Sequence, residues 1–555
     1  MTTNPINTLA VRALAARHHR SECDSNSNTG SRSCDHTYDR TVLEPGCSFI
    51  NEDPFYIVDL GVVASQLERW RAALPRVIPY YAVKCNPDPV IVQTLALLGC
   101  SFDCASRGEI SLVQNVSAEL PDDVPKPDII FANPCKGRAH IIDAVCRGVQ
   151  YMTFDNVAEI HKCASVSKRI KLVLRIFADD SGSQIQLSTK FGAPRQHWNK
   201  LLVEAKQAGL EVVGVSFHVG CGCRDVTRYE MALRDAKEVF EMARRDFGFE
   251  MRILDIGGGF PGETLNSVTH EYDKIDDNNP KSEAKEEEST IMYFEKIAVS
   301  LALMLDEIFP PSSGVKIIAE PGRYFVAACA TLVASVISVR VNLTDDKTSE
   351  DEIITKYRTE SCGGSKNSEL QDNFAYYIND GVYGSFRDNI LFYQPTTRPH
   401  KLCHKIVGVV NREGQDAWRT LKALDDISNG QNESNAMYPS TVFGPTCDSV
   451  DVLFRGVLLP KMNVGDWMYF QNMGAYTSAF ASTYSGFLST EKFYVWNLPS
   501  CNYKKFMDER RVLVGETKTL SRIHLELENQ LPTTEGRSVA LDFARQHAIV
   551  CLNMS

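Results

Sequence analysis

The chain has 555 residues, of which 43% are hydrophobic and 23% charged, so it can build a large core and more than one domain. Its formal net charge of −11 argues against a general nucleic-acid or anionic-membrane binder. The 17 cysteines include no Cys-x-x-Cys pair, and no apolar run reaches the length of a membrane span, which predicts a cytoplasmic protein with reduced thiols, no metal site and no membrane segment.

Residues 1–40 are rich in Ser, Asn and Thr and are predicted to be a disordered leader. The first part of this leader lacks acidic residues and carries Arg12, Arg17 and Arg20. That composition loosely resembles a transit peptide, although a disordered arm is the favoured interpretation.

Residues 41–325 alternate short β-type runs with longer amphipathic helical patterns, apart from a polar insertion at 270–290. Eight alternations in about 250 residues predict a (β/α)8 barrel. A doubly wound open sheet is the alternative, but its glycine cluster would follow the first strand, whereas here it follows the seventh. The predicted barrel strands are Tyr80–Lys84, Ser101–Ala105, Asp128–Ala132, Gln150–Phe154, Lys171–Phe177, Glu211–Val219, Arg252–Gly257 and Lys316–Glu320.

Residues 326–500 lose the helical pattern and are predicted to form an all-β domain, which the first strand or so of the chain can also join. Polar insertions are predicted at 345–373 and 412–440. The tail 501–555 has no assigned role. The predicted β segments are Leu332–Val341, Phe374–Tyr383, Lys405–Val410, Val450–Leu459, Asp466–Phe470 and Phe493–Trp496.

The carboxyl ends of the predicted barrel strands carry polar or glycine residues, and in such barrels these ends form the active site. A lone lysine at a strand end is usually a surface residue with a buried stem, but burial also lowers the pKa of an amine and suits Lys84 to a Schiff base. Gly257–Gly259 and Arg323 suit a phosphate, and Glu320 suits a protonated ring nitrogen. Together these groups specify pyridoxal phosphate. The strand ends are Lys84, Asp103, Asn133, Asp155, Arg175, His218, Asp255 and Glu320.

Ordered motifs run through both predicted domains: Tyr81-Ala-Val-Lys84-Cys-Asn86, Phe102-Asp-Cys-Ala-Ser106, Phe217-His-Val-Gly220, Asp255-Ile-Gly-Gly-Gly-Phe-Pro261, Glu320-Pro-Gly-Arg323-Tyr324, Asn379-Asp-Gly-Val-Tyr-Gly384, Phe443-Gly-Pro-Thr-Cys447-Asp448 and Asn472-Met-Gly-Ala-Tyr476-Thr. They resemble the eukaryotic ornithine decarboxylase family, which are fold-type III pyridoxal-phosphate-dependent decarboxylases. The resemblance covers about Phe55 to Trp496 and implies a barrel that binds the cofactor, followed by a β domain.

The resemblance also implies site residues. Lys84 looks like the Schiff-base lysine, Glu320 like the acid beside the pyridine nitrogen, and His218 like the stacking imidazole. Glu109 matches a further active-site position. The implied cofactor-binding residues are Lys84, Asp103, Arg175, His218, Cys221, Gly257, Gly258, Gly259, Glu320, Gly322, Arg323 and Tyr476.

For the substrate, Cys447 looks like the residue that protonates the carbanion after carbon dioxide leaves, and a thiol is a competent acid near neutral pH. Asp448 looks like the carboxylate for a distal amine. In the family these two residues come from the second subunit, which implies a head-to-tail homodimer with shared active sites.

Two residues depart from the family pattern. Cys221 stands where the family usually has serine, and Tyr393, after Phe392, stands where an aspartate usually binds the distal ammonium. The expected reaction is decarboxylation of L-ornithine to putrescine, with an antizyme-like regulator as a further partner. A paralogue that uses lysine, arginine or a bulkier amino acid is the first alternative. A non-catalytic, regulator-binding pseudoenzyme is the second.

Overall fold

The computed structural model describes residues 52–223, 225–262, 294–341, 374–387, 397–402, 436–496 and 550–551. The predicted leader 1–40 and the predicted insertions 270–290 and 345–373 lie outside these residues, as do most of the predicted insertion 412–440 and of the tail 501–555.

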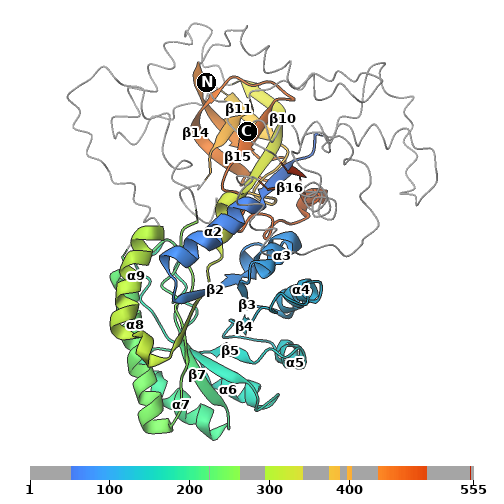
Figure 1. Cartoon of the computed structure of the whole chain (residues 1–555). Coiled ribbons are helices and arrows are strands. Elements are labelled where there is room, and N and C mark those ends of the chain that lie inside the picture. Colours follow the sequence, from blue (N-terminus) through green and yellow to red (C-terminus); the bar gives the residue numbers. More distant parts are fainter. Residues whose placement is uncertain are drawn as a thin grey trace, which may run out of the picture.

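Eight parallel strands of the described residues close into a barrel, in chain order around the ring (Figure 1). β9 pairs with β2 through Val77 and Ile317, which closes the circle. The predicted barrel is therefore confirmed, and the open sheet is excluded. The strands are β2 (Val77–Ala82), β3 (Ser101–Cys104), β4 (Ile129–Phe131), β5 (Tyr151–Phe154), β6 (Lys171–Arg175), β7 (Glu211–Ser216), β8 (Ile253–Asp255) and β9 (Lys316–Ala319).

Helices follow the barrel strands and pack on the outside of the ring (Figure 1). Side-chain caps fix where several of them begin: Asp88 accepts a hydrogen bond from Val90 N at 3.0 Å, and Asn156 accepts one from Glu159 N at 2.9 Å. The helices are α2 (Leu60–Ala73), α3 (Pro89–Leu97), α4 (Arg107–Ala118), α5 (Arg138–Cys146), α6 (Val157–Ala164), α7 (Trp198–Gln207), α8 (Thr227–Met242), α9 (Phe294–Ile308) and the short α10 (Arg323–Val326).

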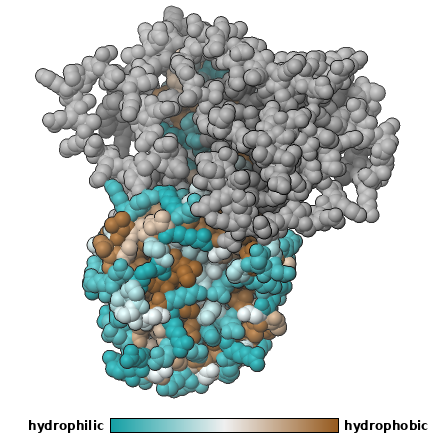
Figure 2. Space-filling view, in the orientation of Figure 1, coloured by the Kyte–Doolittle hydropathy of each residue, from teal (hydrophilic) through white to brown (hydrophobic). Residues whose placement is uncertain are grey.

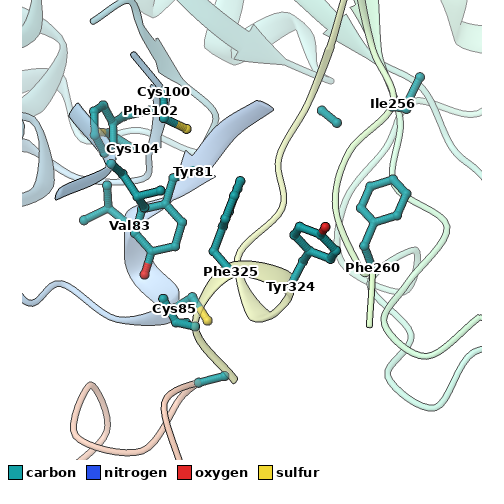
Figure 3. Close-up of a cluster of buried hydrophobic side chains, with 14 of the residues drawn as sticks. Tyr81, Val83, Cys85, Cys100, Phe102, Cys104, Ile256, Phe260, Tyr324 and Phe325 are labelled. Atoms are coloured by element: carbon teal, nitrogen blue, oxygen red, sulfur yellow. The ribbon is translucent and has the colours of Figure 1, made fainter. Parts of the chain in front are cut away.

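An aromatic cluster joins the first and last strands of the barrel (Figure 3). Phe325, from α10, packs edge-on against Tyr81 at 6.0 Å between ring centroids and against Tyr324 at 5.3 Å. Tyr81 in turn contacts Phe102 of β3. All four rings are fully buried, so they hold the segment after β2 beside the segment after β9.

The second domain is a sheet to which nine described strands contribute. Its first strand comes from the start of the described chain, because β1 (Phe55–Asp59) pairs antiparallel with β10 (Ala330–Val341) and parallel with β16 (Glu491–Trp496). The other strands are β11 (Phe374–Ile378), β12 (Pro399–Lys401), β13 (Met437–Phe443), β14 (Val452–Pro460), β15 (Trp467–Phe470) and β17 (Val550–Cys551).

One predicted boundary in this domain is wrong. Residues up to 440 were assigned to a polar insertion, yet β13 begins at Met437 and lies between β11 and β14. Its polar residues Ser440 and Thr441 are buried in the sheet, and Pro439 and Ser440 conceal the strand signal. The predicted strand Lys405–Val410 lies outside the described residues.

The two domains meet at the turn that follows β2. Asp88 accepts hydrogen bonds from Lys492 Nζ at 2.6 Å and Tyr494 Oη at 2.8 Å, both from β16. Asn86 Nδ2 donates to the carbonyl of Gly474 at 2.8 Å. The β domain thus supports the backbone on which Lys84 is mounted.

The outer surface of the barrel is mostly hydrophilic in the view of Figure 2, with smaller apolar areas between the polar ones. Of the helices in the described part of the chain, none combines the length and the apolar character that crossing a membrane requires.

Candidate active site

Lys84 lies just after β2, in the single 3-10 turn η2 (Val83–Cys85), and its amine pairs with the carboxylate of Asp103 at β3. Asp103 is 0% exposed. The sequence predicted that desolvation would lower the pKa of Lys84, and this is wrong for the free lysine. Removal from solvent does lower the pKa, but the nearby carboxylates of Asp103 and Glu320 outweigh it and raise the pKa above its ordinary value.

Three carboxyl groups share this end of the barrel: the buried Asp103, the buried Asp255 at the end of β8, and the half-buried Glu320 after β9. Burial raises the pKa of Glu320 well above its usual range, and repulsion from Asp103 and Asp255 raises it further. Arg175, at the end of β6, and Lys84 act in the opposite direction. The acids and bases at this rim therefore form one electrostatic cluster.

His218, just after β7, is a neutral imidazole. Burial lowers its pKa to about 3, and the positive charges of Arg175 and Lys84 add to the effect. Its Nδ1 accepts a hydrogen bond from Gly220 N at 3.0 Å, which leaves the ring proton on Nε2. The imidazole thus has one tautomer and a fixed orientation at the rim.

The glycine triplet after β8 packs so closely on neighbouring backbone that no side chain would fit there. A Cβ added to Gly258 would lie 2.4 Å from the Glu320 carbonyl oxygen, and one added to Gly259 would lie 2.1 Å from that of Gly220. Gly257 and Gly259 also have positive φ angles of 69° and 87°, which favour glycine. Glycine is therefore required here for close packing on the segments after β7 and β9, and a backbone free of side chains also suits an anion cradle.

Arg323 and Tyr476 lie together beside the Lys84 turn. The guanidinium of Arg323 is 5.4 Å from the centroid of the Tyr476 ring, and Tyr476 N donates to the carbonyl of Cys85 at 2.9 Å. Tyr476 has a positive φ of 56°, a strained conformation for a non-glycine residue of the kind that clusters at functional sites. Gly322 packs against the same turn, since a Cβ there would lie 2.9 Å from Cys85 Cβ.

Several predicted rim residues have local structural contacts instead. Asp155 Oδ2 accepts from Gly192 N at 3.0 Å, and Asn133 Oδ1 accepts from Cys135 N at 2.9 Å. Glu109 helps to cap α4, because its carboxylate accepts from Ala105 N at 2.8 Å and its N–H donates to the N-cap Ser106 Oγ at 3.3 Å. It also lies near the site, since the charges of Asp103 and Lys84 act on its pKa. Cys221 pairs through its backbone with Ile185, and so closes the loop beside Gly220.

Cys447 and Asp448 lie in the loop between β13 and β14. Asp448 is held at both oxygens, because Tyr383 Oη donates to Oδ2 and Val450 N donates to Oδ1 at 3.1 Å. These hydrogen bonds lower the pKa of Asp448, with Tyr383 the larger cause. The side chain of Cys447 is exposed, and the contacts that fix this loop come from its own domain. The predicted substrate residues Phe392 and Tyr393 lie outside the described residues.

The rim residues fit pyridoxal phosphate. They combine an amine, a glycine cradle with a neighbouring guanidinium, and buried carboxyl groups for a ring nitrogen. Asp103 Oδ1 and Asp255 Oδ2 are buried without a hydrogen-bond partner among the described residues, as expected where a polar ligand belongs. The sequence motifs assign no role to Asp255, although an aspartate directly before a glycine cluster at a strand end is a usable signal.

The known proteins most relevant to this geometry are decarboxylases. Residues 60–327 match the family model described as the pyridoxal binding domain of pyridoxal-dependent decarboxylases. The chain is 41% identical to ornithine decarboxylase of Mus musculus over 449 residues, or 81% of this chain and 82% of that one. It is also 41% identical to antizyme inhibitor 2 of Xenopus laevis over 437 residues, which cover 79% of this chain and 80% of that one.

A solved structure has the same architecture. The arginine decarboxylase of Paramecium bursaria Chlorella virus, bound to agmatine, superposes with a TM-score of 0.60 at 29% identity. The match covers 80% of this chain and 95% of that one.

Proposed function

Because the chain belongs to the pyridoxal-dependent decarboxylase family, we propose that it converts L-ornithine into putrescine and carbon dioxide, the first step of polyamine biosynthesis. The observation that carries this proposal is the pairing of a rim that fits the cofactor with a second, anchored carboxylate at Asp448. The bound cofactor at the rim would prepare the α-carbon for loss of a carboxyl group, and the Asp448 carboxylate would suit a substrate with a distal ammonium.

Bound pyridoxal phosphate would supply a conjugated ring that accepts the electron pair left behind when the carboxyl group departs. Lys84 would hold the cofactor at its aldehyde carbon, and Arg323 with the Gly257–Gly259 backbone would bind its phosphate. Glu320 would accept a hydrogen bond from the protonated ring nitrogen. The neutral His218 would lie against the ring without competing for that proton.

Cys447 and Asp448 have separate roles in this proposal. The carboxylate of Asp448, charged at neutral pH because its pKa is lowered, would pair with the distal ammonium and so set the position of the α-carbon. Once the bond from the α-carbon to the carboxyl group breaks and carbon dioxide leaves, the Sγ proton of Cys447 would move to that carbon. The two residues are adjacent, so one loop both selects the substrate and completes the reaction.

We further propose a head-to-tail homodimer in which the Cys447–Asp448 loop of one subunit completes the barrel site of the other. Two exposed apolar residues adjoin this loop: Val450, whose backbone N–H donates to Asp448, is 58% exposed, and Tyr484, which stacks on the Asp448 partner Tyr383, is 46% exposed. Burial of such residues favours association.

Mixing Lys84→Ala with Cys447→Ala subunits tests the shared site. Each variant alone lacks an essential group in both sites, but half of the randomly mixed dimers have one intact site, so about 25% of the wild-type activity should return. Mixed subunits that exchange, as shown by two affinity tags, and stay inactive would contradict the shared site.

The substrate is tested with a panel of ornithine, lysine, arginine and aromatic amino acids, with pyridoxal phosphate supplied. We expect ornithine to have the highest kcat/KM, measured by release of carbon dioxide and of the diamine. Turnover of another amino acid with no turnover of ornithine would favour the paralogue, in which Tyr393 replaces a substrate-binding aspartate. In that case Tyr393→Asp should restore the preference for ornithine.

The similarity to antizyme inhibitor 2 favours a second candidate function, a non-catalytic protein that binds an antizyme-like regulator. The presence of Lys84, Glu320, Cys447 and Asp448 supports the enzyme instead, because a protein without catalysis has no need of all four. A purified chain with no visible absorbance after incubation with pyridoxal phosphate would favour the second candidate.

We also propose a cytoplasmic location. The buried Cys100, Cys104 and Cys163 carry free thiols, which suits a reducing compartment. Imaging of a tagged full-length chain tests this location.

A further inference from the structure

Asp255 is a buried carboxyl group that the proposed reaction has not yet used. It ends β8 and is 0% exposed. Oδ1 accepts a hydrogen bond from Gly257 N at 2.9 Å, whereas no donor among the described residues lies within hydrogen-bond geometry of Oδ2. The carboxyl group of Asp255 does lie close enough to that of Glu320 for a side-chain hydrogen bond between them to lower the pKa of Asp255. A buried carboxylate oxygen without a donor is costly, so its presence here calls for a reason beyond the turn.

The backbone connects Asp255 directly to Glu320. Gly257, whose amide Asp255 holds, accepts a hydrogen bond at its carbonyl from Glu320 N at 2.7 Å. The strands β8 and β9 that carry the two acids are neighbours in the barrel. Asp255 thus fixes the Gly257 backbone to which Glu320 N is hydrogen-bonded. It also places a second carboxyl group near that of Glu320.

The two acids also act on one another electrostatically. Burial raises the pKa of Asp255 to about 7. The pKa of Glu320 is raised first by burial, and then by repulsion from the charges of Asp103 and Asp255. The other groups that face this pair are Lys84 after β2, Arg175 at the end of β6, and the neutral His218 after β7. Of these, Arg175 and Lys84 oppose the effect of Asp255 on Glu320.

We propose that Asp255 is a positioning residue whose negative charge, held beside Glu320, keeps the pyridine nitrogen of the bound cofactor protonated. This inference rests on the proposed placement of that nitrogen at Glu320. A buried negative charge stabilises a nearby protonated ring nitrogen by Coulomb attraction, which is stronger out of water. A protonated ring is the stronger acceptor of electrons.

Asp255→Asn separates this role from a merely structural one. The asparagine oxygen can still accept from Gly257 N, so the turn is kept, while the negative charge is removed. Without that charge the protonated ring is stabilised less, and the ring nitrogen should lose its proton at a pH about one unit lower than in the wild type. The measurement is the ¹⁵N chemical shift of bound pyridoxal phosphate labelled at the ring nitrogen, followed across pH.

A second readout uses binding to the apoprotein rather than activity. Asp255→Asn should weaken pyridoxal phosphate about 10-fold. It should leave the affinity for 1-deazapyridoxal phosphate, in which carbon replaces the ring nitrogen, unchanged. Equal weakening of both compounds, with an unchanged ¹⁵N titration, would mean that Asp255 only holds the turn, and would overturn the proposal.

Two further variants identify which statement fails. Asp128→Asn, at the opposite end of the barrel before β4, is the matched control and should leave the ¹⁵N titration as in the wild type. If Glu320→Gln leaves nitrogen protonation unchanged, the proposed placement of the cofactor is wrong, and the inference is overturned with it. If Glu320→Gln lowers the pH at which the ring nitrogen loses its proton but Asp255→Asn does not, only the inference is overturned.

The wild type alone also tests the proposal, even if Asp255→Asn does not fold. Its bound ring nitrogen should keep its proton to a higher pH than free pyridoxal phosphate does. Loss of the proton at the same pH as in the free cofactor would overturn the proposal.

Discussion

The barrel rim and the Cys447–Asp448 loop are built in opposite ways. At the rim, Lys84, Asp103 and Glu320 are drawn from strands that meet inside one chain, and their charges strongly affect one another. The loop is exposed, and its ordering contacts, Tyr383 and Val450 at Asp448, belong to its own domain. Under the proposed function, the difference means that one chain holds the cofactor, whereas the loop proposed to select and protonate the substrate lies where a second chain could supply it.

Lys84→Ala should have the largest effect and should damage the rim alone. Without the amine, activity should fall by at least about 1,000-fold and the visible absorbance of the bound cofactor should disappear. The subunits should still associate, because the loop is unchanged. Lys171→Ala, at the opposite end of β6, is the control. Visible absorbance retained by Lys84→Ala would contradict the assignment.

Gly259→Ala should have an intermediate effect, again at the rim. The added methyl group would lie 2.1 Å from the Gly220 carbonyl oxygen at a φ of 87°, so the affinity for pyridoxal phosphate should fall about 10- to 100-fold. Fluorescence titration of the apoprotein measures this. Gly148→Ala is a matched control, since Gly148 has a φ of 83° but nothing within 4 Å of the added Cβ. Equal losses in the two variants would remove the argument for a cradle.

Tyr383→Phe should have the smallest effect and should alter the loop alone. Phenylalanine keeps the stack on Tyr484, whose ring centroid lies 4.2 Å away, but loses the hydrogen bond to Asp448. KM for ornithine should rise about 5-fold, while KM for L-2-aminopentanoate, which has no distal amine, should not change. Tyr484→Phe is the control in the same stack. An equal rise in both KM values would show that the loop had moved rather than lost its hold on an ammonium.

Hydrophobic periodicity was enough to predict the barrel. Buried strands such as Lys171–Arg175 are short apolar runs, and their order along the chain is also their order around the ring. Most rim residues could then be predicted from strand ends. The predicted β segments missed β13 entirely, because burial in the middle of a sheet, rather than its composition, makes Met437–Phe443 a strand.

The electrostatics could not be predicted in the same way. The pKa of Lys84 depends on Asp103 and Glu320, which are remote in sequence and come close only when the barrel closes. Asp255 was overlooked for a related reason: its importance lies in a missing partner at Oδ2, and no sequence pattern records a missing hydrogen bond. Burial and charge at the rim are properties of the closed ring.

The hydrogen bond from Asn86 to Gly474 has a consequence for the order of events during synthesis. It joins residues 388 positions apart, and Tyr476 reaches the same turn at Cys85. A nascent chain on the ribosome that has released only its barrel therefore lacks the residues that brace the lysine turn. Cofactor capture becomes a late step of biogenesis, after most of the polypeptide has emerged, and chains truncated before residue 474 should be made as apoprotein.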